Sequence, residues 1–257
     1  MPYIKVNGIQ LYYDTLGEDA GEKIPILLIH GSTITGQIDW SEIAPRLAKS
    51  NKVIIPDCRG HGKSEGTHSY SFRELADDMA ALIRKLGYEK AHVIGHSNGG
   101  NVALVTLVEH PDVVQTAVVQ AANAYVTPYL REREPVVLDP DYYLQNNPKD
   151  VALMIQIHGP RHGREYWREL LSMTMKEIIT EPNYTMQTLS QVERPTLVIM
   201  GSDDRVNAPD RHAQFIAENI PNAELWIPEK TGHNVHMELP DEWIKKVLDF
   251  LNRRGQR

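Results

Sequence analysis

The distribution of hydrophobic residues along the chain predicts alternating strands and helices. Short, nearly unbroken apolar runs recur, and such runs are typical of strands that are covered on both faces. Between them, apolar residues return every three or four positions, which is the period of an amphipathic helix. This alternation predicts an α/β domain with a mostly parallel central sheet flanked by helices. The strands are expected at residues 24–30, 53–55, 92–94, 116–119, 196–200 and 224–227.

The chain begins with a different pattern, an alternation around a turn. Residues 3–6 and 9–13 flank Asn7-Gly8, which is the strongest short signal for a β-hairpin. We therefore expect two antiparallel strands before the alternating region.

Helix boundaries can be read at several places. Ser71 and Glu74 have the spacing of a capping box, in which a hydroxyl and a carboxylate satisfy backbone N–H groups at a helix start. Apolar residues follow at helical spacing as far as Gly87, a typical C-terminal stop. Two more helices are expected at 209–220 and 241–251.

Residues 126–189 interrupt the alternation of strands and helices. This stretch has no convincing buried strand, but Tyr, Met, Arg and Glu residues recur at helical spacing. We interpret it as a helical cap inserted into a core made of residues 1–125 and 190–257. A peripheral helical layer with no role in substrate choice is the alternative. Prolines are expected to divide the stretch into short pieces: Pro128, Pro135, Pro140, Pro148, Pro160 and Pro182.

Composition and charge exclude several classes of protein. The 257 residues carry a net charge of −7 with scattered basic residues, which argues against a nucleic-acid partner. The only cysteine is Cys58, so no internal disulfide can form. No apolar run approaches the roughly 20 residues that span a bilayer, and the first residues lack a signal-peptide pattern. We expect a soluble cytoplasmic protein without a membrane partner.

Ser97 is the candidate nucleophile. It lies in Gly95-His96-Ser97-Asn98-Gly99, which matches G-x-S-x-G between the strand at 92–94 and a helical pattern at 100–105. Strand, sharp turn and helix form the context of a nucleophile elbow, whose strained backbone requires small neighbours. The helix N-terminus also favours developing negative charge. The alternative is a glycine-rich turn in which the serine only caps the helix.

A nucleophilic serine needs a histidine base and a carboxylate that orients it. Downstream of Ser97, His233 lies in the loop after the strand at 224–227, and Asp204 in the loop after the strand at 196–200. Loops that follow strands often carry functional residues. Two neighbours compete for these roles: Asp203 as the acid and His236 as the base.

These motifs resemble those of the α/β-hydrolase superfamily over essentially the whole chain. The order serine, acid, histidine matches that family, as do His30-Gly31 and the loop at 56–64. The resemblance implies the α/β-hydrolase fold and a catalytic triad of Ser97, His233 and Asp204. It also implies an oxyanion hole formed by the backbone amides of Ser32 and Asn98, and a structural role for Asp57 and Arg59 in the 56–64 loop.

Two stretches, residues 122–127 and 232–236, resemble the biphenyl-hydrolase-like branch, which includes valacyclovir hydrolase. That branch cleaves α-amino-acid esters, and its residue after the nucleophile is an aspartate that holds the ammonium group of the substrate. Here that position is Asn98. A charged hydrogen bond is worth roughly 1.5–3 kcal/mol against about 1 for a neutral one, so this departure weakens any preference for an amine. The cap carboxylates available to compensate are Glu132, Glu134 and Asp139.

The expected reaction is hydrolysis of a small to medium carboxylic ester through an acyl-enzyme on Ser97, without a cofactor. A carbon–carbon bond hydrolase or a perhydrolase would share the triad and is the alternative. A non-catalytic ligand receptor on this scaffold is a further alternative, against which the intact triad argues. A dehalogenase or an epoxide hydrolase would use an aspartate nucleophile, so Ser97 argues against both of these activities.

The cap holds two further features of interest. Tyr125, Tyr129 and Trp167 are expected either to line an acyl pocket or to pack the cap. His158 and His162 suggest a metal pair, but a proline lies between them and no further ligand lies at suitable spacing, so no metal is expected.

Overall fold

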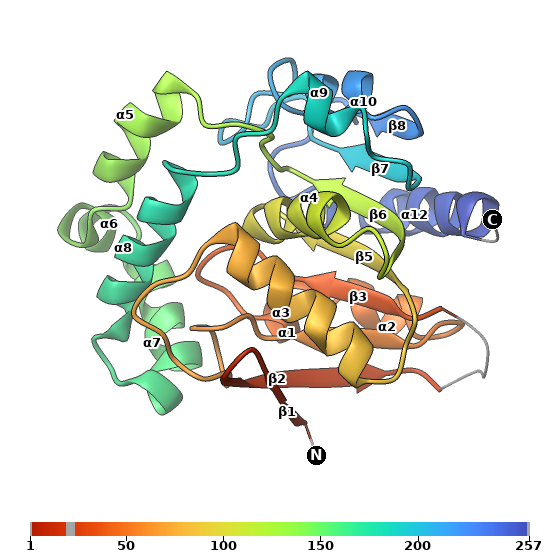
Figure 1. The fold of residues 1–257 in the computed structure, drawn as a ribbon. Helices are drawn as coiled ribbons and strands as arrows, with labels where there is room; N and C mark the ends of the chain where they lie inside the picture. Colours follow the sequence, from red (N-terminus) through yellow and green to blue (C-terminus); the bar gives the residue numbers. More distant parts are fainter. Residues whose placement is uncertain (1, 19–23, 256–257) are drawn as a thin grey trace.

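The computed structural model describes residues 2–18 and 24–255, and its core is an eight-stranded sheet (Figure 1). The strand order is β1-β2-β4-β3-β5-β6-β7-β8. β1 and β2 run antiparallel, and the strands from β4 to β8 pair in parallel. This confirms the expected mostly parallel sheet. The strands are β1 (Tyr3–Val6), β2 (Ile9–Leu16), β3 (Ile26–Ile29), β4 (Val53–Pro56), β5 (Ala91–His96), β6 (Val114–Gln120), β7 (Thr196–Ile199) and β8 (Ala223–Trp226).

The hairpin predicted at the start of the chain is present. β1 and β2 pair in register, with Val6 opposite Ile9 beside the turn. The turn residues Asn7 and Gly8 have φ values of 41° and 87°, as a two-residue hairpin turn with positive φ at both positions requires.

Side chains alternate between the two faces of the sheet and build two hydrophobic layers. Leu27 and Ile29 of β3 point toward the layer that holds α3 (Phe72–Lys85) and α4 (Asn98–Glu109). Ile26 and Leu28 point to the opposite layer, which includes Trp40 directly after α1 (Gly36–Asp39), together with α2 (Ile43–Leu47) and α12 (Pro240–Arg254). Burial on both faces explains why these strands read as unbroken apolar runs.

The helix boundaries agree with the expected ones at α3 and differ elsewhere. Ser71 caps α3 by accepting the Glu74 N–H at 3.1 Å, and Gly87 follows the helix with a φ of 86°. The helix expected at 209–220 is shorter: α10 spans Ala213–Asn219, because the residues before it form turns that close on Ala208. The short helices α9 (Met186–Leu189) and α11 (Val235–Glu238) were not predicted.

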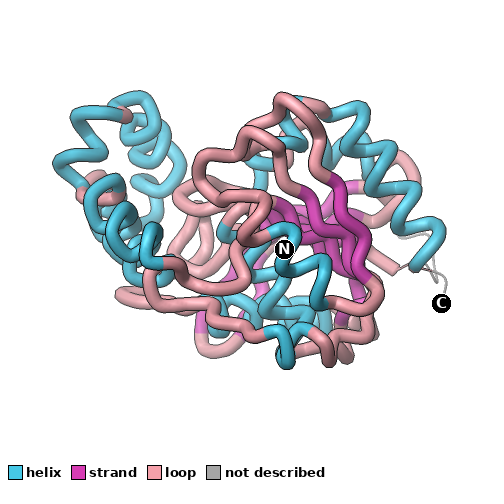
Figure 2. The backbone as a smooth tube through the Cα atoms, turned by 90° about the horizontal axis from the view of Figure 1, so that it is seen from above, coloured by secondary structure: helices cyan, strands magenta, loops and turns pink. Residues whose placement is uncertain are grey.

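The stretch between β6 and β7 is helical and lies to one side of the sheet (Figures 1 and 2). It contains α5 (Pro128–Val137), α6 (Pro140–Asn146), α7 (Pro148–His162) and α8 (Tyr166–Ile178). Three of the prolines begin helices, where a missing N–H costs nothing. Pro135 and Pro160 lie inside α5 and α7, so the expectation that every proline divides the stretch is wrong.

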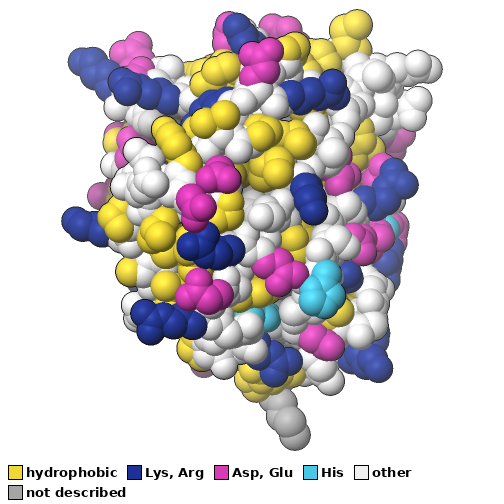
Figure 3. All heavy atoms as spheres, turned by 90° about the vertical axis from the view of Figure 1, so that its left-hand side faces the viewer, with side chains coloured by type: hydrophobic (Ala, Val, Ile, Leu, Met, Phe, Trp, Pro, Cys, Tyr) yellow, Lys and Arg dark blue, Asp and Glu magenta, His cyan; other side chains and the backbone are white. Residues whose placement is uncertain are grey.

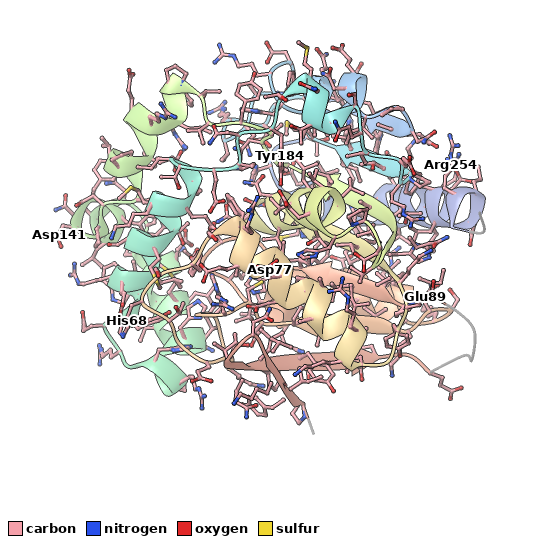
Figure 4. All side chains as sticks on the ribbon, viewed as in Figure 1. His68, Asp77, Glu89, Asp141, Tyr184 and Arg254 are labelled. Atoms are coloured by element: carbon pink, nitrogen blue, oxygen red, sulfur yellow. The ribbon has the colours of Figure 1, made fainter. Side chains whose placement is uncertain are left out.

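The outer face of these helices mixes apolar and charged side chains (Figure 3). Arg168 pairs with Asp141 at 2.8 Å and His68 with Glu169 at 2.9 Å (Figure 4 labels Asp141 and His68). Exposed pairs of this kind are screened by solvent and contribute little to stability. None of the described helices is long and apolar enough to cross a lipid bilayer.

The loop between β4 and α3 is fixed by buried charges. The Asp57 carboxylate accepts the Lys63 N–H at 3.0 Å and the Gly36 N–H at 3.3 Å. Arg59 donates from Nε and Nη2 to the two oxygens of Asp78, at 2.6 and 2.8 Å. The Asp78 side chain is fully buried and that of Arg59 is 9% exposed, so this is a desolvated, two-pronged ion pair. These contacts support the structural role expected for Asp57 and Arg59.

We predict that Asp78→Ala lowers the free energy of unfolding by about 3–5 kcal/mol, because it leaves the buried Arg59 with only the half-exposed Glu74, at 3.4 Å, as an ionic partner. The matched control is Asp112→Ala, which removes the exposed pair with Arg84 (2.6 Å) and should cost under about 1 kcal/mol. Urea unfolding midpoints at equal m-values measure both. Equal losses in the two variants would contradict the assignment of Arg59 to a buried pair.

Candidate active site

Ser97 lies at a strained turn between β5 and α4. Its backbone has φ 56° and ψ −121°, a conformation that a residue with a side chain rarely adopts. A Cβ on Gly95 would lie 1.9 Å from the Gly99 carbonyl oxygen, and one on Gly99 would lie 2.2 Å from the Ile29 carbonyl oxygen. The two glycines of the motif are therefore required by close backbone approaches, as the sequence predicts for an elbow.

Ser97, His233 and Asp204 form a continuous hydrogen-bonded chain. His233 Nε2 lies 2.9 Å from Ser97 Oγ, and His233 Nδ1 lies 2.8 Å from Asp204 Oδ2. A carboxylate accepts, so Nδ1 carries the proton and Nε2 accepts from the serine hydroxyl. The three residues follow β5, β8 and β7, whose carboxyl ends meet at one edge of the sheet.

Asp204 is held in place and kept ionised. Its Oδ1 accepts the backbone N–H groups of Val206 at 2.8 Å and Asn207 at 3.0 Å. Burial favours the neutral acid, but the hydrogen bond and charge of His233, together with these N–H groups, outweigh it and hold the pKa of Asp204 below its ordinary value.

The two competitors identified in the sequence lie elsewhere. Asp203 is exposed and accepts a hydrogen bond from the Ser202 hydroxyl at 2.9 Å. His236 is fully buried, and its Nε2 lies 3.1 Å from the Asp39 carbonyl oxygen. Neither side chain contacts Ser97 or its partner histidine through a hydrogen bond in the described part of the chain.

A second buried group, Asp39 with His96 and His236, lies behind Ser97 and has the proximity of a metal site. The hydrogen bonds decide its chemistry. Gln120 Oε1 accepts from Trp243 Nε1 at 2.6 Å, so Gln120 Nε2 donates to His236 Nδ1 at 2.8 Å.

His236 therefore carries its proton on Nε2, which faces Asp39. His96 Nδ1 lies 3.1 Å from the Asp39 carboxylate and donates to it. Burial opposes an ionised Asp39, but its interactions with the two histidines outweigh burial and place its pKa far below the usual range. The donor set is that of a hydrogen-bonded carboxylate, since both facing nitrogens carry protons rather than the lone pairs a metal needs.

Asp39 also anchors the loop after β3. Its Oδ2 accepts the Gly31 N–H at 2.8 Å, which fixes the backbone one residue before Ser32. The N–H groups of Ser32 and Asn98 donate to no partner in the described residues, and both residues line the same cavity as Ser97. Two free backbone donors beside a serine hydroxyl are what an oxyanion hole requires.

A cavity of about 650 Å³ lies between the sheet edge and the helices α5 to α7. Its wall includes Tyr142, Tyr143, Arg133 and Glu134 in addition to Ser97 and His233. Arg133 forms an ion pair with Glu134, whose carboxyl is buried, and burial raises the pKa of Glu134.

Of the two roles considered for Tyr125, Tyr129 and Trp167, lining the pocket is wrong, because none of them belongs to the described lining of the cavity. Tyr125 packs on His212 and Phe215 and donates to the Arg211 carbonyl oxygen at 3.2 Å. Tyr129 is 50% exposed. Trp167 belongs to a small core inside the helical layer, with Val151, Met154 and Leu171. Helical spacing does not distinguish a side chain that faces the substrate from one that faces a neighbouring helix.

Of the three cap carboxylates considered, only Glu134 lines the cavity. Glu132 is exposed, and Asp139 accepts the N–H groups of Asp141 and Tyr142 at the start of α6. His158, considered as half of a metal pair, instead accepts the Gly62 N–H at Nδ1 and donates from Nε2 to the Thr33 carbonyl oxygen.

One residue of the site region was missed. Glu177 of α8 is buried and its Oε2 accepts from Asn98 Nδ2 at 3.1 Å. The signal was available, since Glu177 follows Leu170 and Met173 at helical spacing and so occupies a position of the buried face.

Comparison with known proteins places the chain in a family. Residues 24–153 match the family of the alpha/beta hydrolase fold. Serine hydrolase BPHL of Mus musculus is 28% identical over 256 residues, covering 96% of this chain and 85% of that protein. The putative carbamate hydrolase RutD of Pseudomonas savastanoi pv. phaseolicola is 27% identical, covering 89% of this chain and 94% of that protein.

A solved structure agrees. Est816, described as an N-acyl homoserine lactone degrading enzyme, superimposes with a TM-score of 0.78 at 26% identity, covering 97% of this chain and all of that chain. The chain belongs to the α/β-hydrolase fold family, and it is a hydrolase.

Proposed function

We propose that this chain is a serine hydrolase that cleaves small to medium carboxylic esters through an acyl-enzyme on Ser97. The observation that carries the proposal is the hydrogen-bonded chain from Ser97 through His233 to Asp204, on a strained elbow that opens into the cavity. The relatives support acyl chemistry, since their names describe a serine hydrolase, a carbamate hydrolase and a lactone-degrading enzyme.

In the first half of the reaction, Ser97 Oγ attacks the ester carbonyl while His233 Nε2 accepts its proton. Negative charge develops on the carbonyl oxygen, where the N–H groups of Ser32 and Asn98 stabilise it. His233 then protonates the departing alcohol, which leaves the acyl group on Ser97.

In the second half, His233 takes a proton from water, and the resulting nucleophile attacks the acyl carbon. Collapse of the tetrahedral intermediate returns the proton to Ser97 and releases the acid. Asp204 accepts from Nδ1 throughout, which holds the tautomer and stabilises the imidazolium. The residues named perform every step, so the proposal requires no cofactor.

We predict that Ser97→Ala lowers kcat for a p-nitrophenyl ester by about 10⁴- to 10⁶-fold, because the nucleophile is removed. The urea midpoint of unfolding should not fall, since the substitution removes only one hydroxyl group. Retention of wild-type turnover in a homogeneous Ser97→Ala preparation would disprove the nucleophile.

The adjacent aspartates provide a test of the acid. Asp204→Asn should lower kcat about 10³- to 10⁴-fold, because an amide cannot hold the same histidine tautomer. Asp203→Asn, one residue earlier and exposed, should change kcat less than twofold, an order-of-magnitude bound for a remote surface site. A large loss in the second variant and none in the first would assign the acid to Asp203.

The substrate class can be tested with a valine aryl ester and its analogue lacking the amino group. Asn98 next to the nucleophile is neutral, and the buried Glu134 carboxylate in the cavity wall is already paired with Arg133. We expect the two kcat/KM values to agree within about tenfold, since a charged hydrogen bond exceeds a neutral one by only about 1 kcal/mol. A preference above about a hundredfold for the amine would instead mean an α-amino-acid ester hydrolase.

A further inference from the structure

Glu177 brings a carboxyl group from the helical layer to the back of the elbow. It is 2% exposed, and it receives a hydrogen bond of 3.1 Å from the side-chain amide of Asn98. Asn98 is the residue directly after Ser97 and the first residue of α4. The same residue therefore offers its backbone N–H toward the reaction and its side chain toward α8.

A second, much smaller cavity lies at this contact. Its volume of about 10 Å³ is enclosed by Glu177, Asn98, His61, Cys58 and Tyr70, with other residues of the oxyanion loop and α4. A space of this size accommodates about one water molecule, provided that polar groups face it.

Two residues that line this small cavity each carry a polar atom that is sealed from solvent and has no hydrogen-bond partner among the described residues: Glu177 Oε1 and His61 Nε2. His61 Nδ1 lies 3.0 Å from the Arg59 carbonyl oxygen and must donate to it. His61 Nε2 is consequently a bare acceptor. A donor on Glu177 Oε1 would complement it.

The surroundings keep Glu177 in the neutral acid form, which supplies that donor. Burial, and then the charges of Glu181 and Glu74, raise the pKa of Glu177 well above its ordinary value.

The other titratable groups at the small cavity are neutral as well. Burial lowers the pKa of His61 and raises those of Cys58 and Tyr70. His30 accepts the Cys58 N–H at Nε2, which leaves that nitrogen unprotonated. The described residues that line the small cavity thus provide no cation to balance an ionised carboxylate.

We propose that Glu177 is a positioning residue for the oxyanion hole: from α8 it fixes Asn98, and one water in the small cavity links its second oxygen to His61 Nε2. This inference rests on the proposed function, because it takes the Asn98 N–H as an oxyanion donor. A water that accepts from Glu177 Oε1 and donates to His61 Nε2 satisfies both sealed atoms. The neutral acid also suits the reaction, since an ionised Glu177 would repel the negative charge that develops beside Asn98.

The test compares Glu177→Leu with Glu177→Gln, using an aryl ester for kcat and KM and an aryl trifluoromethyl ketone as a transition-state analogue. Glutamine retains an acceptor for Asn98 Nδ2 and a donor for the small cavity, so its kcat should remain within about threefold of wild type. Leucine removes both, and kcat should fall about 10- to 100-fold while KM changes less than about threefold, because only the transition state uses the hole. The ketone should bind more weakly, so its inhibition constant should rise by about the factor by which kcat falls.

Glu181→Leu is the matched control. Glu181 also joins this region to the core, through the Phe72 N–H at 3.0 Å, but it does not contact Asn98. It should lose stability without a change in kcat beyond about twofold, because burial, the largest cause of the raised pKa of Glu177, remains when the Glu181 charge is removed.

Asn98→Ala approaches the same contact from the other side and does not depend on the folding of a leucine variant. It keeps the backbone N–H and removes the amide that Glu177 holds, so kcat should fall by about the same factor, and Glu177→Leu should add little to it. Wild-type kcat in Asn98→Ala, or a Glu177→Leu loss confined to stability or KM, would overturn the inference. These outcomes are separate from failure of the proposed function, which would appear as turnover in Ser97→Ala whatever residue 177 is.

Discussion

The site depends on one backbone constraint, the conformation of Ser97 at the end of β5. With φ at 56° the chain reverses direction within a residue, so the serine projects into the cavity and α4 begins directly behind it. The turn is over-determined by its neighbours. Ser97 N–H donates to Gln120 on β6, and close approaches from β3 and β6 leave no room for a Cβ on Gly99 or Gly100. A strained residue persists only where packing fixes it in this way.

Three buried carboxyl groups belong to the region around Ser97, and the surroundings of each determine whether it is ionised. Asp204 stays ionised because it is hydrogen-bonded to His233 and to two backbone N–H groups. Asp39 stays ionised because Gly31, His96 and His236 all donate toward it. Glu177 has a single donor and no neighbouring cation among the described residues that enclose it, so it is neutral. Of these three carboxyl groups, the two that receive several N–H donors are ionised, and the one that receives a single donor is neutral.

The sequence predicted the parts of the molecule that short-range rules govern. Strands buried on both faces, the Asn7-Gly8 turn and the Ser71 cap follow from local pattern and turn chemistry. The spacing of Asp204 and His233 after their strands was also sufficient to find both partners of Ser97, since the carboxyl ends of parallel strands converge.

The helical layer between β6 and β7 was predictable only as helical. Its side chains face three environments, namely solvent, one another and the core, and a single 3.6-residue period cannot separate them. From the sequence, Trp167 could line the substrate pocket or pack the cap, and in the structure it packs against Leu171 inside the layer. Pro135 and Pro160 were expected to divide the stretch, yet both lie within helices. Positions of this kind are decided by contacts between segments far apart in the chain.

Two of those distant contacts lie close to the proposed oxyanion hole in the chain. His158 of α7 donates to the Thr33 carbonyl oxygen, next to Ser32, and Glu177 of α8 holds the side chain of Asn98. The Ser32 N–H is therefore one residue away from a buried contact with the helical layer. The Asn98 N–H belongs to a residue whose own side chain makes such a contact. Since hydrogen bonds at such a hole act on developing charge rather than on bound substrate, changes in this layer should act on kcat as well as on substrate binding. If the proposed oxyanion hole holds, the layer is part of the catalytic framework as well as a cover for the cavity.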